Sequence, residues 1–287
     1  METQALTLAQ LRKQPHWSCS SISTFMMCSL AWAFRYVYRL ERGATPAALV
    51  FGGCFHKALG FLFRKRLSGE AVQLKVILDL FSDLLLQETN IAEPAVLYSE
   101  GDDVKSFTDR GRQMLEAYVK DLDPEERVLA VDVPFCVPLE DGDGNRLSKP
   151  LIGEYDAVVV GKNDAQIIID WKTARARYAE LYVVNHLQPT CYLYAHKMVG
   201  GPENTKFRFD VVTKTKTPTI QKCLTRRDPD TFFRLVEIVR TIEKAVRHEC
   251  FIPNDQSWCC RGCEYGLACQ AWHKERHRSL CNFQLAA

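Results

Sequence analysis

The sequence contains no run of 18 consecutive apolar residues, so it does not predict a membrane-spanning helix. The apolar run from Phe25 to Phe34 is short, and no basic segment precedes it, so it does not predict a secretory signal peptide. We therefore expect no membrane partner and a location in the reducing cytoplasm. In that compartment, the 12 cysteines of the sequence are more often metal ligands or buried thiols than disulfides.

An excess of charge of one sign is also absent, because the formal net charge is only +2. This balance neither predicts nor excludes a nucleic-acid partner, since such binding needs a local basic surface rather than a basic total. The phosphate-binding loop G-x-x-x-x-G-K-[ST] is missing, so the sequence contains no evident motor. What is present is a hydrophobic fraction of 47% in 287 residues, enough for a sizeable core in one large domain or two smaller ones.

The hydrophobic pattern changes from helical to strand-like near residue 126. Before this point it predicts helices over 55–67, 72–86 and 107–119. After it, the pattern predicts strands over 128–139, 151–160, 165–170, 207–213 and 219–224, and helices over 188–198 and 230–249. Nearer the start, Ser21 or Ser23 is expected to cap a helix that carries Cys28. Helices before and after a strand-rich block indicate an α/β fold.

The segment 153–173 combines two carboxylates with a lysine. Asp156 lies on one strand of a predicted hairpin and Asp170 ends the next, so antiparallel pairing can bring the two together. Their hard oxygen ligands suit Mg²⁺ or Mn²⁺. Lys172 shares a face with Asp170, where a cation can orient an attacking water and stabilise charge on a phosphoryl group. The alternative is a plain surface ion pair, but the apolar run Ile167–Ile169 places these charges at the mouth of a buried strand.

Three cysteines near the end of the sequence have the spacing of metal ligands. Cys260, Cys263 and Cys269 form C-x2-C-x5-C, and soft thiolates at this spacing suit zinc or an iron–sulfur cluster. His273 follows at four residues, so a local zinc site is one alternative, and Cys259 could substitute for Cys260. The spacing alone leaves zinc and a cluster open.

The segment 206–227 concentrates positive charge, with seven Lys or Arg residues and one Asp. It could follow a phosphate backbone, or it could be an ordinary solvated hairpin. Phe207 and Phe209 alternate with charged residues, so we expect these two rings in the core rather than in contact with bases.

Four motifs, in order, resemble the RecB-like branch of the PD-(D/E)XK nucleases, which includes helicase–nuclease domains, CRISPR adaptation nucleases and phage exonucleases. The motifs are Phe51–Leu59 (FGGCFHKAL), Gly153 with Asp156, Asp170–Thr173 (DWKT), and Gln188 with Tyr192. The resemblance extends from about Ser21 to Cys269, nearly the whole chain. It nominates His56 as a metal-binding histidine, and Gln188 and Tyr192, which share a helix face, as residues that position DNA.

The resemblance implies a single nuclease domain over 1–287, with a restriction-endonuclease-like core: a mixed central sheet flanked by helices. A helical part is expected over about 20–125, the catalytic sheet over about 126–225, and a terminal helix with a cysteine-rich segment over about 229–275. It also implies a metal-dependent DNA exonuclease acting on single strands or DNA ends. The residues His56, Asp156, Asp170 and the Trp171 backbone carbonyl would hold Mg²⁺ or Mn²⁺, with Lys172 as a further catalytic residue.

Members of that branch with an iron–sulfur cluster use one upstream cysteine and three beyond the nuclease core. The segment Ser21–Phe34 resembles the upstream part and nominates Cys28, so a [4Fe-4S] cluster on Cys28, Cys260, Cys263 and Cys269 is expected, with structural Zn²⁺ as the alternative. The implied settings are recombination, repair, phage DNA processing or CRISPR adaptation in a prokaryotic or phage-infected cell. A helicase, a recombinase or an adaptation protein is the implied partner. The alternative function is a module that binds DNA ends for such a complex and has only secondary nuclease activity.

Overall fold

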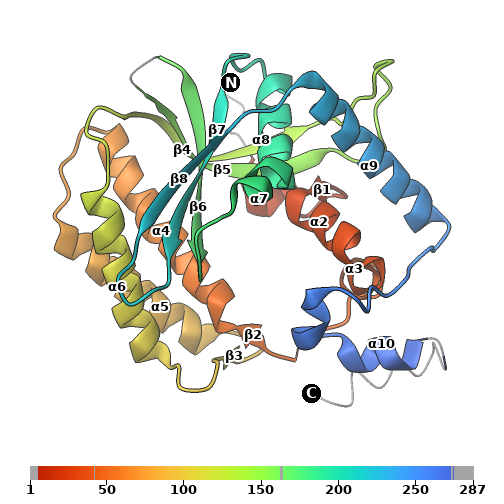
Figure 1. Ribbon diagram of the computed structural model, residues 1–287, viewed down its shortest axis with the longest axis horizontal. Coiled ribbons are helices and arrows are strands. Elements are labelled where there is room, and N and C mark those ends of the chain that lie inside the picture. The colour runs from red at the N-terminus through yellow and green to blue at the C-terminus, as the bar shows by residue number, and fades with distance from the viewer. Residues whose placement is uncertain (1–5, 42, 162–163, 273, 275–287) are drawn as a thin grey trace.

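A twisted, mixed β-sheet with helices on both faces organises the fold (Figure 1). The computed structural model describes residues 6–41, 43–161, 164–272 and 274. In this part of the chain, the sheet consists of β1 (Trp17–Ser18), β4 (Arg127–Val137), β5 (Leu151–Val160), β6 (Gln166–Ala174), β7 (Lys206–Thr213) and β8 (Ile220–Thr225). The order is β1-β5-β6-β7-β8, and β4 also pairs with β5. The β6–β7 and β1–β5 pairs are parallel, whereas β4–β5, β5–β6 and β7–β8 are antiparallel.

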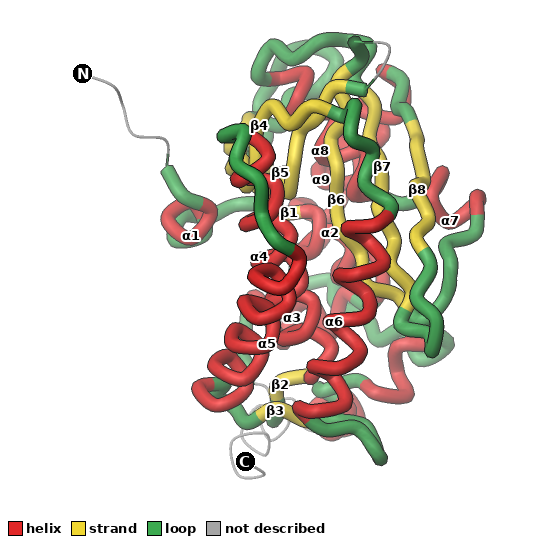
Figure 2. The backbone as a smooth tube through the Cα atoms, turned by 90° about the vertical axis from the view of Figure 1, so that its left-hand side faces the viewer, coloured by secondary structure: helices red, strands yellow, loops and turns green. Residues whose placement is uncertain are grey.

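Helices connect and cover these strands. They are α1 (Leu8–Leu11), α2 (Cys19–Met27), α3 (Ser29–Tyr36), α4 (Ala47–Leu67), α5 (Leu74–Ile91), α6 (Val104–Lys120), α7 (Glu180–Asn185), α8 (Leu187–Met198), α9 (Pro229–Arg247), the 3₁₀ helix η1 (Trp258–Gly262) and α10 (Gly266–Trp272). A small parallel pair, β2 (Thr45–Pro46) and β3 (Val96–Leu97), lies at the end of α4 and α5 that is away from the main sheet (Figure 2).

The two faces of the sheet have separate hydrophobic cores. On one face, Phe55 of α4 and Phe81 of α5 pack in a cluster with Trp171 of β6. On the other face, Leu193 of α8 and Leu235 of α9 belong to a cluster with the inner strands. Because each fully buried side chain of this kind contributes about 1.5–3 kcal/mol, the central strands β6 and β7 are fixed from both sides.

The start of the second helix differs from the prediction. Ser18 caps α2: its hydroxyl accepts from the Ser21 amide at 3.2 Å, and the Ser21 hydroxyl accepts from the Ser18 amide at 2.9 Å. The expected cap at Ser21 or Ser23 was wrong, because Ser21 instead takes the third helical position of a capping box. Cys28 lies at the junction of α2 and α3 with an extended backbone rather than inside a helix, and its sulfur accepts from the Ala31 amide at 3.4 Å.

Helix α4 begins at Ala47, well before the predicted start at residue 55. The helix continues through Gly52 and Gly53 because Phe51 and Cys54 are buried on its inner face. By length and composition this helix could cross a membrane, yet half of its most apolar window is buried within the fold, as in a core helix.

Strand β5 has the predicted bounds, and α8 begins one residue before its predicted start, with Pro189 tolerated in its first turn. Strand β6 differs, because it continues to Ala174 instead of ending at Asp170. Parallel pairing with β7, from Ile167↔Lys206 to Ala174↔Thr213, maintains this extension. Asp170 is therefore inside a central strand rather than at its mouth.

Candidate active site

The predicted antiparallel pairing of β5 and β6 is confirmed, and its last pair is Ala157↔Ile169. Asp156 and Asp170 occupy the next positions on the two strands. At these positions the hydrogen bond between the two strands is made by a side chain instead of a backbone carbonyl. Asp156 Oδ2 accepts a hydrogen bond of 2.7 Å from the Trp171 amide. This contact ties the first carboxylate to the strand that carries the second.

Asp170 is almost completely buried, with 2% of its surface exposed. The side-chain amide of Gln188 donates to Asp170 Oδ1, and Lys172 Nζ lies 2.5 Å from Oδ2. Even so, Oδ2 accepts no hydrogen bond of good geometry from any described residue. Burial raises the pKa of Asp170 to about 6, with the charge of Lys172 opposing the shift.

His56 reaches the same place from α4. Its Nδ1 lies 3.1 Å from Asp156 Oδ2, and its ring meets the Trp171 indole edge-on at 5.9 Å. Burial alone would lower the pKa of His56, but the charge and the hydrogen bond of Asp156 outweigh it and raise the pKa. Burial likewise opposes the charge on Lys172, yet Asp170 and Asp156 keep its pKa raised. Lys172 is therefore a cation at neutral pH, beside both carboxylates.

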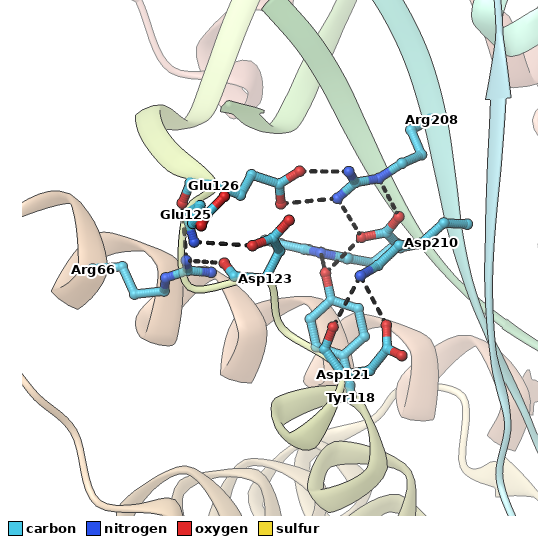
Figure 3. A network of polar contacts seen from close by, with 10 residues as sticks. Arg66, Tyr118, Asp121, Asp123, Glu125, Glu126, Arg208 and Asp210 are labelled. Carbon is cyan, nitrogen blue, oxygen red and sulfur yellow. Dashed lines mark hydrogen bonds and ion pairs between the residues drawn. The ribbon is translucent and has the colours of Figure 1, made fainter. Parts of the chain in front are cut away.

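Behind the site, a buried polar network fixes the Trp171 side chain. The indole donates to the Tyr118 hydroxyl at 2.9 Å, and that hydroxyl donates to Asp210 Oδ2 at 2.7 Å. Arg208 bonds both Asp210, at 2.6 Å, and Glu126, at 2.5 Å (Figure 3). Trp171 belongs to this network, and its amide also orients Asp156, so the network connects the buried core to the site.

The sequence interpretation missed this network. Arg208 and Asp210 alternate with Phe207 and Phe209 on β7, and all four side chains are buried. An Arg and an Asp two positions apart on a strand share a face, and that pairing was the available signal. Burial opposes the Arg208 charge, but Asp210 and Glu126 outweigh it and raise its pKa. The fold requires Arg208, Asp210 and Glu126 together, because loss of one of them leaves a buried charge without a partner.

Gln188 and Tyr192, the two residues predicted to position DNA, lie on one face of α8, and their side chains are within hydrogen-bonding reach of each other. Gln188, at the start of α8, contacts Asp170 as described. Tyr192 is a core residue, with its ring 5.6 Å from Phe135, 5.5 Å from Tyr155 and 5.7 Å from Phe207. Gln188 therefore contacts one of the two carboxylates directly, and Tyr192 packs in the core next to it.

The donors present fit a divalent cation, although among the described residues no three His, Cys, Asp or Glu side chains converge closely enough to hold one as they stand. Two carboxylates, one imidazole and a backbone carbonyl are the hard and intermediate donors that Mg²⁺ and Mn²⁺ accept. The observation that favours such a ligand is Asp170 Oδ2, which is buried and lacks a well-formed hydrogen bond.

The four predicted cluster cysteines lie at one end of the molecule, where the chain segments before α4 and after α9 meet. The Leu30 amide donates to the Ile252 carbonyl at 3.2 Å, and the Asn254 side chain donates to the Met27 carbonyl at 2.8 Å. These bonds place Cys28 beside the terminal segment. The cysteines that the structure describes are free thiols.

The thiols of these cysteines influence one another's pKa. Burial raises the pKa of Cys269 to about 11, and Asp255 and the thiols of Cys28, Cys263 and Cys260 add to the shift. Cys260 also donates to the Asn254 carbonyl at 3.1 Å, and Cys259 points to the Met27 sulfur at 2.8 Å. Soft thiolates suit a thiolate-bound metal group, but no three of these cysteines, all within the described part of the chain, converge closely enough to hold one as they stand. His273, the ligand of the alternative zinc site, lies outside the described residues.

The basic segment 206–227 forms the β7–β8 hairpin rather than a continuous cationic track. Arg208 belongs to the buried network, Lys222 lies 2.8 Å from Asp121, and Arg227 donates to the carbonyls of Val183 and His186. Phe207 and Phe209 are core residues, as predicted. The cations of this segment therefore have different roles.

Comparison with known proteins agrees with this architecture. Residues 16–270 match the family model described as the PD-(D/E)XK nuclease superfamily. The crystal structure of a candidate exonuclease from Eubacterium rectale is similar, with a TM-score of 0.52 and 12% identity over 90% of this chain and 93% of that one, which shows a shared fold. The structure of SSO0001 is 16% identical over 74% of this chain and 95% of that one, but its TM-score of 0.34 is too low to carry an argument. No curated protein matches the sequence.

Proposed function

Because the chain belongs to the PD-(D/E)XK nuclease superfamily, we propose that it is a divalent-metal-dependent deoxyribonuclease that digests single-stranded DNA or DNA ends as an exonuclease. The observation that carries the proposal is the meeting of Asp156, Asp170, Lys172 and His56 at the opened end of the β5–β6 ladder. Unlike a purely structural buried ion pair, this site leaves Asp170 Oδ2 buried without a well-formed hydrogen bond, which supports a site that holds a ligand.

In this proposal, His56, Asp156, Asp170 and the Trp171 carbonyl hold Mg²⁺ or Mn²⁺. Such an ion, when bound, lowers the pKa of a water ligand and neutralises charge on a phosphoryl oxygen. The protein supplies orientation: the Trp171 amide fixes Asp156, and Gln188 fixes Asp170.

Lys172 is proposed as the residue that acts on the reacting atoms. Its ammonium lies 2.5 Å from Asp170 Oδ2 and stays charged at neutral pH. From there it can donate to the attacking water and to a phosphoryl oxygen, and so stabilise the negative charge that develops there. As the water oxygen bonds to phosphorus, the water releases a proton to solvent and the phosphodiester P–O bond breaks, and the leaving oxygen takes up a proton from solvent.

A [4Fe-4S] cluster on Cys28, Cys260, Cys263 and Cys269 is the cofactor proposed for the far end of the molecule, with zinc as the alternative metal. The proposal is supported by the neighbouring cysteines, whose thiols help to raise the pKa of Cys263 and of Cys269. Its bonds would join segments separated by most of the chain, which favours the folded state in the way other long-range cross-links do.

The proposed setting is DNA recombination, repair, phage DNA processing or CRISPR adaptation, in the cytoplasm of a prokaryotic or phage-infected cell. The absence of a phosphate-binding loop from the sequence supports a separate helicase, recombinase or adaptation protein as the partner that opens the duplex.

The experiment is incubation of purified protein with 5′- or 3′-end-labelled single- and double-stranded DNA, in Mg²⁺, in Mn²⁺ or in chelator. We expect progressive shortening from one end that requires a metal ion. An absence of cleavage with both ions, or cleavage that continues in chelator, contradicts the proposal. Accumulation of internal fragments would replace the exonuclease by an endonuclease.

A further inference from the structure

A second group of cations lines an open pocket between α6 and the β7–β8 turn. Arg110 of α6 and Lys214 and Lys216 of the turn line the pocket, with Asp109 as its acidic lining residue. Arg175, just beyond β6, is near enough to Lys214 to influence its charge. Four cations thus gather where three separate elements meet.

Lys214 is held firmly within this group. Its amide donates to the Ala174 carbonyl at 2.7 Å, and its ammonium lies 4.8 Å from the centre of the Phe51 ring. Among the described residues, the Lys214 ammonium makes no ion pair with a carboxylate; Arg110 is the cation here that has one, with Asp102 at 3.0 Å. The aromatic contact positions the lysine, and its charge has no carboxylate partner among the described residues.

The charge on Lys214 opposes folding. Burial, together with Arg110 and Arg175, lowers the pKa of Lys214 to about 8. Because the unfolded chain holds this proton more tightly than the folded chain, the charge destabilises the folded state at neutral pH, and this effect disappears above the unfolded pKa. A residue kept at such a cost is more easily explained by binding than by packing.

Lys214 is bonded to the strand that carries the proposed catalytic residues, through the Ala174 carbonyl. Ala174 follows Lys172 by two residues on the same strand, a step of about 7 Å at 3.2–3.4 Å per residue. Phe51 lies on α4, the helix that carries His56. A strand whose phosphate sits at Asp170 and Lys172 can therefore present a nearby phosphate to Lys214.

We propose that Lys214, Arg110, Arg175 and Lys216 form a binding site for a second phosphate group of the nucleic-acid strand. The ligand is either an internal backbone phosphate or a terminal phosphate near the cleaved bond, and both offer the same acceptor oxygens to the cations. The site deepens the proposed nuclease function and rests on it. It would fix the register of the strand over the metal site without reading its sequence.

The test measures DNA binding by fluorescence anisotropy in chelator, so that cleavage does not interfere. Single-stranded oligonucleotides carry a 5′-phosphate, a 3′-phosphate or no terminal phosphate. For Lys214→Met we expect about tenfold weaker binding at low salt. The slope of log K against log salt should fall by about 0.7, as for one lost contact to a single strand. The melting temperature at pH 7 should rise, because a repelled charge is removed.

Lys222→Met is the matched control from the same hairpin, since its ammonium already pairs with Asp121 at 2.8 Å. It should leave the salt slope unchanged and should not raise the melting temperature. A Lys214→Met protein with an unchanged salt slope, or a wild-type protein that binds none of the strands, overturns the site. A loss confined to one phosphorylated end identifies a terminal phosphate, and an equal loss on all three strands identifies an internal one.

Failure of the phosphate site and failure of the nuclease function can be distinguished by comparing DNA binding with DNA cleavage. Binding that depends on Lys214 in a protein that never cleaves DNA contradicts the nuclease function and leaves the phosphate site standing. Metal-dependent cleavage by a protein whose DNA binding does not depend on Lys214 supports the nuclease function and overturns the phosphate site.

Discussion

The Trp171 amide donates a 2.7 Å hydrogen bond to Asp156 Oδ2, in the place where the backbone ladder between β5 and β6 would otherwise continue. One residue thus orients one proposed metal ligand with its amide and offers another through its carbonyl. Its indole is held in turn by Tyr118. Residues outside the site should therefore influence metal binding through Trp171.

Removing the Tyr118 hydroxyl tests this connection. Tyr118→Phe leaves the Trp171 indole and Asp210 without their shared partner in a buried place. We expect about 1–3 kcal/mol of lost stability in denaturant unfolding. Calorimetric titration of the folded variant should show Mn²⁺ affinity reduced about 10-fold or more, as for other residues that orient metal ligands. Equal stability loss with wild-type Mn²⁺ affinity would show that the network serves packing alone.

Metal affinity should depend on pH. Burial raises the pKa of the Asp170 carboxyl to about 6, and the pKa of His56 is also raised, so protons compete with the cation for both groups. Affinity for Mn²⁺ should begin to fall as the pH drops through the raised pKa of His56, and it should fall more steeply, by more than about tenfold per pH unit, below the pKa of Asp170, where both groups hold protons. Titrations at intervals from pH 5 to pH 8 give the profile. A flat profile across pH 6 would remove Asp170 from the ligand set.

The histidine is assigned to the metal and not to DNA. His56→Ala should therefore weaken metal binding more than it weakens DNA binding in chelator, because its Nδ1 faces Asp156. His16→Ala is a control, since the His16 ring is bonded to the Gln14 carbonyl away from the site. An unchanged midpoint for metal in His56→Ala would mean that this ring only packs against Trp171.

The cysteines give a prediction about colour and iron content. Protein purified without oxygen should be brown and contain about four irons, since thiolate-to-iron charge transfer absorbs visible light and zinc does not. Cys28→Ser should lower iron content and solubility together, whereas Cys250→Ser, which changes an exposed thiol bonded to the His248 carbonyl, should do neither. A colourless protein that holds one zinc and depends on His273 instead of Cys28 would establish the alternative site.

Local pattern predicted much of this site, since strand β5, helix α8 and the β5–β6 hairpin depend on alternation and turn residues close in sequence. Three features depend on partners far away and could not be predicted in that way. The extension of β6 past Asp170 requires pairing with β7. The Tyr118–Asp210 bond joins residues 92 positions apart. The environment of Lys214 is made by α4, α6 and the end of β6 together.

The central claim is that Lys172 and Asp170 perform metal-dependent hydrolysis of DNA. The most direct measurement compares single-turnover cleavage of end-labelled single-stranded DNA, in saturating Mn²⁺, by the wild type, Lys172→Met and Asp170→Asn. Lys197→Met serves as the control, because Lys197 of α8 lies over the ring of Phe232 on α9. We expect both site variants to fold and to cleave at least about 100-fold more slowly, as when a charge-stabilising donor is lost, and the control to match the wild type. Cleavage at the wild-type rate by either site variant would contradict the account.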